Sequence, residues 1–204
     1  MAGHAAAGVG RRERKKLETR ERIRAAASEL FTRHGYGAAT MRQIANRAHV
    51  GLGTLFNYAE DKRDLVFLIF NEELNAMTDV ALAAPRAGQP LLEQLVEVFR
   101  VHYRWLGAKP ALARILLQEL TFYSSGKQAA TFHGIRKRLI DGIEDLVRRA
   151  QRKGGYSSKE NPQLVARHIF FVYSASLRWW IAAARPVAAK GVAELRTLLR
   201  LVIK

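Results

Sequence analysis

The amino-acid sequence predicts an all-α protein of about nine helices, in which a small N-terminal three-helix domain precedes a larger helical domain. Apolar residues recur every three or four positions through most of the chain, which is the period of a helix. No segment alternates apolar and polar residues as a half-buried strand does. Glycines, prolines and capping residues divide the chain into pieces of helical length.

The first four helices are indicated by their apolar faces and their end signals. A first helix from Leu17 carries Ile23, Ala26, Ala27, Leu30 and Phe31 on one face. It should end at Gly35, and Thr40 is expected to cap a short second helix. A third short helix should reach about Tyr58. Asp61, with Asp64 three residues later, resembles a capping box that opens a fourth helix.

Five further helices are expected after a break rich in proline and glycine at residues 81–90. Pro110 and Pro162 suit the first position of a helix, and Asn161 suits the cap before the second of these. Gly154 and Pro186 should each end a helix. The expected ranges are about 91–109, 110–122, a long helix around Ile135 to Val147, 162–185, and a last amphipathic helix bearing Leu195, Leu198, Leu199, Val202 and Ile203.

The composition excludes several classes of protein. Lys and Arg number 34 against 18 Asp and Glu, and this net charge of +16 favours a polyanionic partner. The absence of cysteine excludes disulfides, zinc–thiolate sites, iron–sulfur clusters and cysteine nucleophiles. The most apolar stretch, His168–Ala184, contains Arg178 and is shorter than the ~20 residues of a membrane span, which predicts a buried helix. The start MAGHAAAGVG does not resemble a signal peptide, so we expect a soluble, cytoplasmic protein.

The second and third helices suggest a helix-turn-helix, because they are short and only three or four residues join them. His49 lies in the turn, and histidine is one of the non-glycine residues enriched at positive φ. This stretch resembles the DNA-binding segment of the TetR family of transcriptional regulators. The matching residues, in register and without a gap, are Gly35-Tyr36, Thr40, Ile44-Ala45, Val50, Gly53-Thr54-Leu55-Phe56, Tyr58 and Lys62. Three positions depart from the family pattern: His49, Gly51 and Ala59.

The resemblance implies a role for each residue of this segment. Residues expected to contact phosphates are Thr40, Thr54, Tyr58 and Lys62. Residues expected to face the major groove are Arg42, Leu52, Gly53 and Asn57. For Leu52 the alternative is packing in the core. The resemblance also implies a DNA-binding domain over residues 17–62 and a ligand-binding and dimerisation domain over residues 63–204.

Residues 1–16 are expected to form a disordered arm before the first helix. Its positive charges are Arg11, Arg12, Arg14, Lys15 and Lys16, against the single negative charge of Glu13. Two interpretations remain open: the arm contacts DNA, or it is a plain solvated tail.

The larger domain is expected to bind a small-molecule effector and to dimerise, as in the family. Candidate ligand-binding residues are Phe99, His102, Tyr103, Phe122, Tyr123, Phe170 and Tyr173, and the alternative for each is an ordinary core position. Residues 63–204 hold 22 Lys and Arg against 12 Asp and Glu. This excess fits either an apolar or amphipathic effector that is anionic, such as a fatty acid or an acyl-CoA thioester, or simply scattered surface charge. The helix 162–185 is apolar nearly all round, so it should be covered on every side. The resemblance implies that, together with the last helix, it forms a four-helix homodimer interface.

These features together predict a homodimeric regulator, a repressor released from a palindromic double-stranded operator by its effector. The alternatives are an activator of the same family and a non-specific, architectural DNA-binding protein. An enzyme is not expected, because the histidines lack metal-ligand spacing and no dinucleotide loop, Walker A segment or Gly-x-Ser-x-Gly elbow occurs. No cofactor, metal or membrane partner is predicted.

Overall fold

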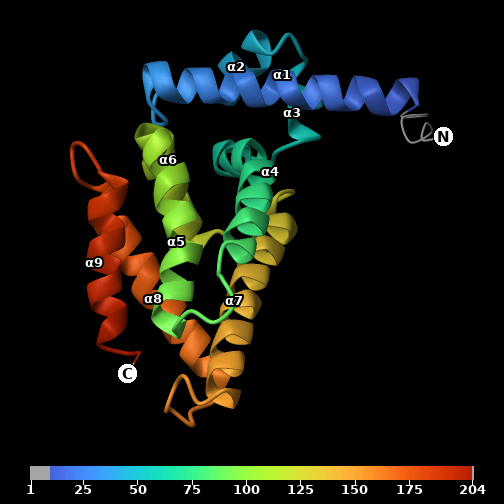
Figure 1. Ribbon diagram of the computed structural model, residues 1–204. Coiled ribbons are helices and arrows are strands. Elements are labelled where there is room, and N and C mark those ends of the chain that lie inside the picture. Colours follow the sequence, from blue (N-terminus) through green and yellow to red (C-terminus); the bar gives the residue numbers. More distant parts are fainter. Residues whose placement is uncertain (1–9, 204) are drawn as a thin grey trace, which may run out of the picture. The chain divides into compact units, whose positions relative to one another are not determined.

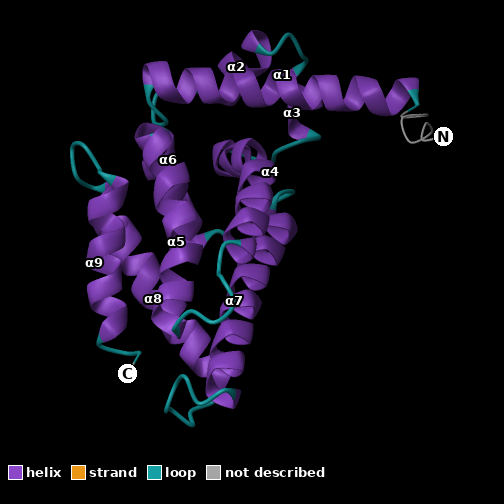
Figure 2. Cartoon of the chain, in the orientation of Figure 1, coloured by secondary structure: helices purple, strands orange, loops and turns teal. Residues whose placement is uncertain are grey.

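The computed structural model describes residues 10–203, which fold into helices joined by loops (Figures 1 and 2). The helices are α1 (Arg11–His34), α2 (Met41–Arg47), α3 (Leu52–Phe56), α4 (Lys62–Ala83), α5 (Leu91–Ala108), α6 (Pro110–Glu119), α7 (Ala129–Arg152), α8 (Pro162–Ile181) and α9 (Ala188–Arg200), with a 3-10 turn, η1 (Leu120–Phe122), after α6. Residues 10–203 contain no strand, so the predicted all-α class is confirmed. The part of the predicted arm that precedes Gly10 lies outside the described residues.

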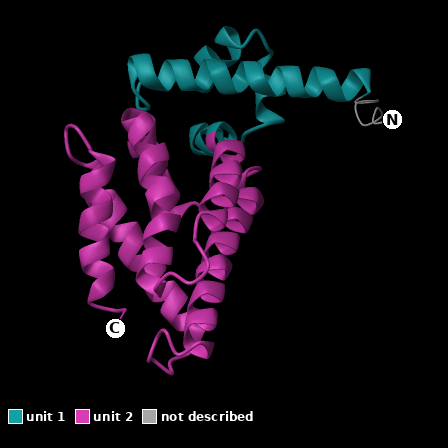
Figure 3. Cartoon of the chain, in the orientation of Figure 1, with its two compact units in different colours: residues 1–69 teal, residues 70–204 magenta. Residues whose placement is uncertain are grey.

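The chain forms two compact units that divide after Ile69 (Figure 3). The sequence placed this boundary after Lys62, at the start of α4. The helix passes through the division without a break, since it runs from Lys62 to Ala83. Its first two turns belong to the first unit, where Arg24 of α1 donates a hydrogen bond of 2.9 Å to the carbonyl of Ile69.

The ends of the short helices in the first unit follow from single residues. Thr40 caps α2 as expected, and its partner is Gln43: each side chain accepts a hydrogen bond from the other residue's backbone N–H, at 3.2 and 2.9 Å. His49 has a φ of 53°, which turns the chain between α2 and α3. Gly51 precedes α3 without a side-chain cap, as its lack of a side chain requires. The Asp64 N–H donates to Asp61 Oδ1 at 2.7 Å, which is half of the predicted capping box.

The disordered arm predicted for residues 1–16 is wrong over residues 11–16, which form the first turns of α1. These residues lack an apolar face, so the pattern of apolar spacing did not reveal them. Arginine and lysine are nevertheless good helix formers, and Arg14 pairs with Glu18 one turn later at 3.7 Å. The basic residues therefore stand on an exposed helix.

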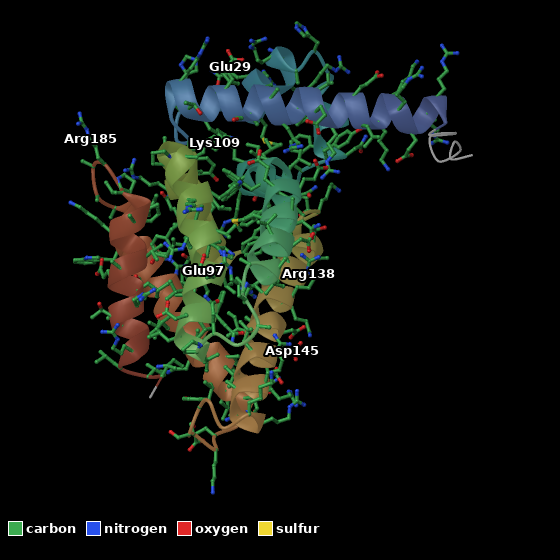
Figure 4. All side chains as sticks on the ribbon, in the orientation of Figure 1. Glu29, Glu97, Lys109, Arg138, Asp145 and Arg185 are labelled. Carbon is green, nitrogen blue, oxygen red and sulfur yellow. The ribbon has the colours of Figure 1, made fainter. Side chains whose placement is uncertain are left out.

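In the second unit, α5 packs against α9 and α7, and α8 packs against α7 and α9. Gly191 of α9 permits one of these close approaches. A Cβ there would lie 2.5 Å from Tyr103 of α5 and 2.7 Å from Trp180 of α8. The hydroxyl of Tyr103 is paired with Ser176 of α8 at 2.9 Å. On the opposite side, Arg138 of α7, labelled in Figure 4, forms an ion pair with Asp79 of α4 at 3.0 Å.

Most predicted helix ends lie within a few residues of those observed. Pro110 and Pro162 occupy first-turn positions as expected, and Asn161 caps α8 by accepting a hydrogen bond from the backbone of Gln163. Two helices end earlier than expected, because α8 stops at Ile181 and α9 at Arg200.

Candidate functional site

The residues expected to face a DNA groove lie on the surface of the first unit. Arg42, Gly53 and Asn57 are exposed, and Leu52 is half-buried. The two arginines of α2 differ in their surroundings. Arg47 forms an ion pair of 2.7 Å with Glu29 of α1, which is labelled in Figure 4. Arg42, in contrast, makes no hydrogen bond or ion pair with any residue in the described part of the chain. The guanidinium of Arg42 therefore has all its donors available.

Three of the four expected phosphate contacts use their polar groups within the first unit. The hydroxyl of Thr40 donates to Gln43 Oε1 at 3.0 Å, and the hydroxyl of Tyr58 donates to the Lys16 carbonyl at 3.2 Å. A hydroxyl has one hydrogen, so each must leave this partner before it can donate to a phosphate. The fourth residue, Thr54, is exposed on α3.

Lys62, at the start of α4, contacts the loop that precedes α2. Its ammonium group donates hydrogen bonds to the carbonyls of Tyr36 at 2.8 Å and Gly37 at 3.0 Å. The same nitrogen lies 4.9 Å from the centre of the Tyr36 ring, within the range of a cation–π interaction. Sequence reasoning missed this role, because the partners lie more than twenty positions away.

The second unit contains a partly open cavity of about 310 Å³ that five helices and η1 line. Its wall is mainly apolar and is formed by leucine, isoleucine, methionine and phenylalanine side chains. The polar residues in the wall are Thr78 of α4, His102 of α5, Thr121 of η1, Arg136 of α7, and Tyr173, Ser174 and Arg178 of α8. An apolar cavity with two arginines suits a ligand that has an apolar body and a negative end.

The structure brings three of the seven predicted ligand residues into this wall: His102, Phe170 and Tyr173. The other four do not line it. Phe99 lies behind the wall and stacks on Tyr173 with ring centres 4.3 Å apart. Tyr103 is held by Ser176, Tyr123 is buried with its ring 6.0 Å from that of Phe132, and Phe122 is 82% exposed. Arg136 and Arg178 were not predicted as ligand contacts, although Arg178 interrupts the most apolar stretch of the sequence.

Comparison with known proteins assigns both units. Residues 23–69 match the family model described as bacterial regulatory proteins, tetR family, and residues 88–183 match the tetracyclin repressor-like, C-terminal domain. The transcriptional regulator HbdR of Aromatoleum sp. (strain CIB) is 40% identical over 180 residues, which cover 87% of this chain and 77% of HbdR. The chain belongs to the TetR family of transcriptional regulators.

Solved structures with a similar fold cover most of the chain. The TetR-family repressor FadR of Thermus thermophilus, solved with lauroyl-CoA, has a TM-score of 0.68 and 25% identity over 90% of this chain and 92% of its own. FadR of Bacillus subtilis, solved with stearoyl-CoA, has a TM-score of 0.70 and 21% identity over 90% of this chain and 97% of its own. The likeness of the second, at 21% identity, shows the fold.

In this TetR-family regulator the polar groups of two aromatic residues in the cavity wall have unusual surroundings. His102 is 3% exposed, and its Nδ1 donates to the Val98 carbonyl at 3.1 Å. Burial lowers the pKa of His102 to about 4, although the Val98 hydrogen bond acts in the opposite direction. Burial also raises the pKa of Tyr173 well above its ordinary value. Both side chains are therefore neutral at pH 7.

A stripe of apolar side chains on α8 of the TetR-family regulator is exposed, and one of them, Phe171, also lines the cavity. Leu164, Phe171 and Trp179 are exposed, and their spacing of seven and eight residues puts them on one helix face. Trp179 is 77% exposed. The helix was expected to be covered on every side, and within one copy of the described chain this face is not.

Within residues 10–203 no three His, Asp or Glu side chains gather as metal ligands. No helix in the same range has the length and apolar character needed to cross a membrane.

Proposed function

We propose that this TetR-family regulator is a homodimeric repressor, which binds a palindromic operator through α2 and α3 and leaves it when an effector enters the cavity. The observation that carries the proposal is that the two units of one chain have different features, one suited to DNA and the other to a small ligand. An exposed Arg42 without a partner belongs to the first unit, and a mainly apolar cavity belongs to the second. Helix α4 contributes to both units, and it is the element through which an effector would act on the DNA-binding unit.

DNA binding by two copies is supported by the size of α3. Five residues form this helix, so one copy reaches few base pairs, and a second copy on a symmetric site is needed for specificity. In the complex, Arg42 would pair with a guanine, while Leu52, Gly53 and Asn57 approach the groove. Thr40, Thr54, Tyr58 and Lys62 would contact phosphates, the first and third after releasing their present partners.

The second copy is supported by the exposed stripe on α8. Apolar side chains at Leu164, Phe171 and Trp179 would be buried against the same stripe of a partner related by two-fold symmetry. Helix α9 packs beside α8 and would complete a four-helix interface.

The effector class that fits is an acyl-CoA thioester. The apolar wall suits the acyl group, and Arg136 and Arg178 suit a negative group at its end. The net positive charge of residues 63–204 also favours an anionic effector. The related T. thermophilus FadR was solved with lauroyl-CoA, which supports the class without deciding the chain length.

A footprinting experiment on genomic fragments tests the proposal. Discrete, two-fold symmetric protection is expected, and lauroyl-CoA should reduce it. The double variant Arg136→Gln, Arg178→Gln should keep the footprint but require more lauroyl-CoA for release. Uniform protection would instead indicate an architectural protein, increased transcription from the bound site would indicate an activator, and a footprint insensitive to every acyl-CoA would remove this effector class.

A further inference from the structure

One buried polar atom of a residue in the cavity wall has no hydrogen-bond partner in the described chain, the Nε2 atom of His102. The hydroxyl of Tyr173, in the same wall, also makes no hydrogen bond with a described residue. Buried hydroxyls close by are paired: Tyr103 with Ser176 at 2.9 Å, and Thr78 with the Leu74 carbonyl at 2.7 Å. Buried polar groups in proteins are normally paired, so the unpaired Nε2 atom of His102 needs a reason.

The tautomer of His102 follows from its one partner. The Val98 carbonyl can only accept, so Nδ1 carries the hydrogen that it donates. In the neutral ring Nε2 then has a free lone pair and no hydrogen. Atom Nε2 is therefore a buried hydrogen-bond acceptor without a donor.

The ring of Tyr173 lies beside that of His102 in the same wall. The rings of His102 and Tyr173 meet edge to face with centres 5.4 Å apart, and both residues line the cavity. Phe99 stacks on the Tyr173 ring with ring centres 4.3 Å apart, and its own ring centre lies 6.2 Å from that of His102. A phenol both donates and accepts, so this pair offers one acceptor and one group of either kind.

We propose that the cavity selects a ligand whose apolar part carries a hydroxyl group, which donates to His102 Nε2 and accepts from the Tyr173 hydroxyl. A hydroxyl can donate to His102 and accept from Tyr173 at the same time. A ligand without a donor leaves His102 Nε2 unpaired on binding, and sites of this kind discriminate strongly against such analogues. The inference deepens the proposed function by adding a specificity that an apolar wall with two arginines does not provide.

A matched pair of small probes tests this independently of DNA and of coenzyme A. Phenol and toluene have similar shapes and differ in one hydroxyl, and their dissociation constants can be measured by NMR titration. The preference for phenol over toluene should fall about tenfold or more in His102→Leu, and His102→Gln, which restores an acceptor, should recover part of it. Tyr103→Phe is the control, because it removes a buried hydroxyl that is already paired outside the wall.

A spectroscopic measurement on the unaltered protein tests the proposal even if a variant does not fold. Phenol should shift the Nε2 nitrogen resonance of His102, and toluene should not. Equal discrimination in the unaltered protein and His102→Leu, or an Nε2 resonance that phenol does not move up to its solubility, overturns the proposal. Since neither probe contains coenzyme A, failure here leaves the acyl-CoA experiment unaffected.

Discussion

The ammonium group of Lys62 lies 4.9 Å from the centre of the Tyr36 ring and donates to the Tyr36 carbonyl at 2.8 Å. One side chain thus joins the start of α4 to the loop between α1 and α2. Tyr36 in turn packs edge to face on Phe31 of α1, with ring centres 5.1 Å apart. Lys62 therefore holds the first unit together, whatever it contributes to DNA binding.

Replacing Lys62 by methionine should lower the free energy of unfolding by about 1–2 kcal/mol, because it removes a cation–π contact and two charge-assisted hydrogen bonds. Urea unfolding measures this. Lys15→Met is the control, since the side chain of Lys15 is exposed and makes no hydrogen bond or ion pair with a described residue. If Lys62 also contacts a phosphate, the salt dependence of DNA binding should fall by about one unit of slope. An unfolding free energy equal to that of the control would contradict the structural role.

The substitution Gly53→Ala should change the stability of the first unit and its affinity for DNA in opposite directions. A Cβ at this position meets no atom within 4 Å, and Gly53 lies inside α3. The first unit should therefore gain about 0.5–1 kcal/mol from the better helix former. Affinity for the operator should nevertheless drop about tenfold if the backbone approaches the bases there. Fluorescence anisotropy with a labelled operator measures the affinity, and unchanged binding would place Gly53 away from the groove.

Gly191→Ala should destabilise the second unit. The new methyl group would lie 2.5 Å from Tyr103 and 2.7 Å from Trp180, and both rings are held by hydrogen bonds to Ser176 and the Val187 carbonyl. Overpacking of this kind costs about 1–3 kcal/mol, measurable as a lower Tm. Gly134→Ala in α7, where a Cβ meets nothing within 4 Å, should leave the Tm unchanged or raise it. Equal effects of the two substitutions would show that α9 can move away.

Stability should fall between pH 7 and pH 5 partly because of His102. Burial lowers the pKa of His102 from 6.5 to about 4 in the folded protein. The unfolded chain therefore takes up a proton below pH 6.5 that the folded chain takes up only near pH 4, and the stability present above pH 6.5 is lost across that interval. The expected loss by pH 5 is about 2 kcal/mol relative to His102→Gln, from urea unfolding at both pH values. Parallel pH curves for the two proteins would contradict it.

Trp179→Asp should weaken dimerisation without unfolding the protein. The side chain is 77% exposed in one copy, so a charge there costs the isolated fold little. In a dimer it would place two charges against an apolar surface. Sedimentation velocity should show monomers at concentrations where the unaltered protein sediments as a dimer, and Val80→Asp, an exposed apolar position on α4, should not have this effect. A dimer of unchanged stability would exclude the α8 stripe as the interface.

Features that depend on neighbouring residues were predictable from the sequence. The Thr40 cap, the positive φ of His49 and the helix starts at Pro110 and Pro162 each depend on residues within a few positions. The first turns of α1 were missed because basic residues without an apolar face form a helix by propensity alone.

Contacts between distant residues were not predictable in the same way. Tyr58 and Lys16 are 42 positions apart, and the partners of Lys62 lie 25 and 26 positions away. The composition of the cavity wall also depends on contacts between distant residues. His102 and Tyr173 both line the cavity because α5 and α8 pack together. Phe99, one helical turn from His102, lies behind the wall. Residue type indicates aromatic core positions, but only packing decides which of them line a cavity.

Two consecutive tryptophans at the end of α8 differ sharply in their surroundings. Trp179 is 77% exposed, whereas Trp180 is 5% exposed and donates its indole N–H to the Val187 carbonyl at 3.0 Å. Indole emission shifts to longer wavelength in water, so the pair gives the protein two optical probes on one helical turn. Removal of water from Trp179 would shift its share of the emission of the three tryptophans to shorter wavelength, a change that can be followed without any label.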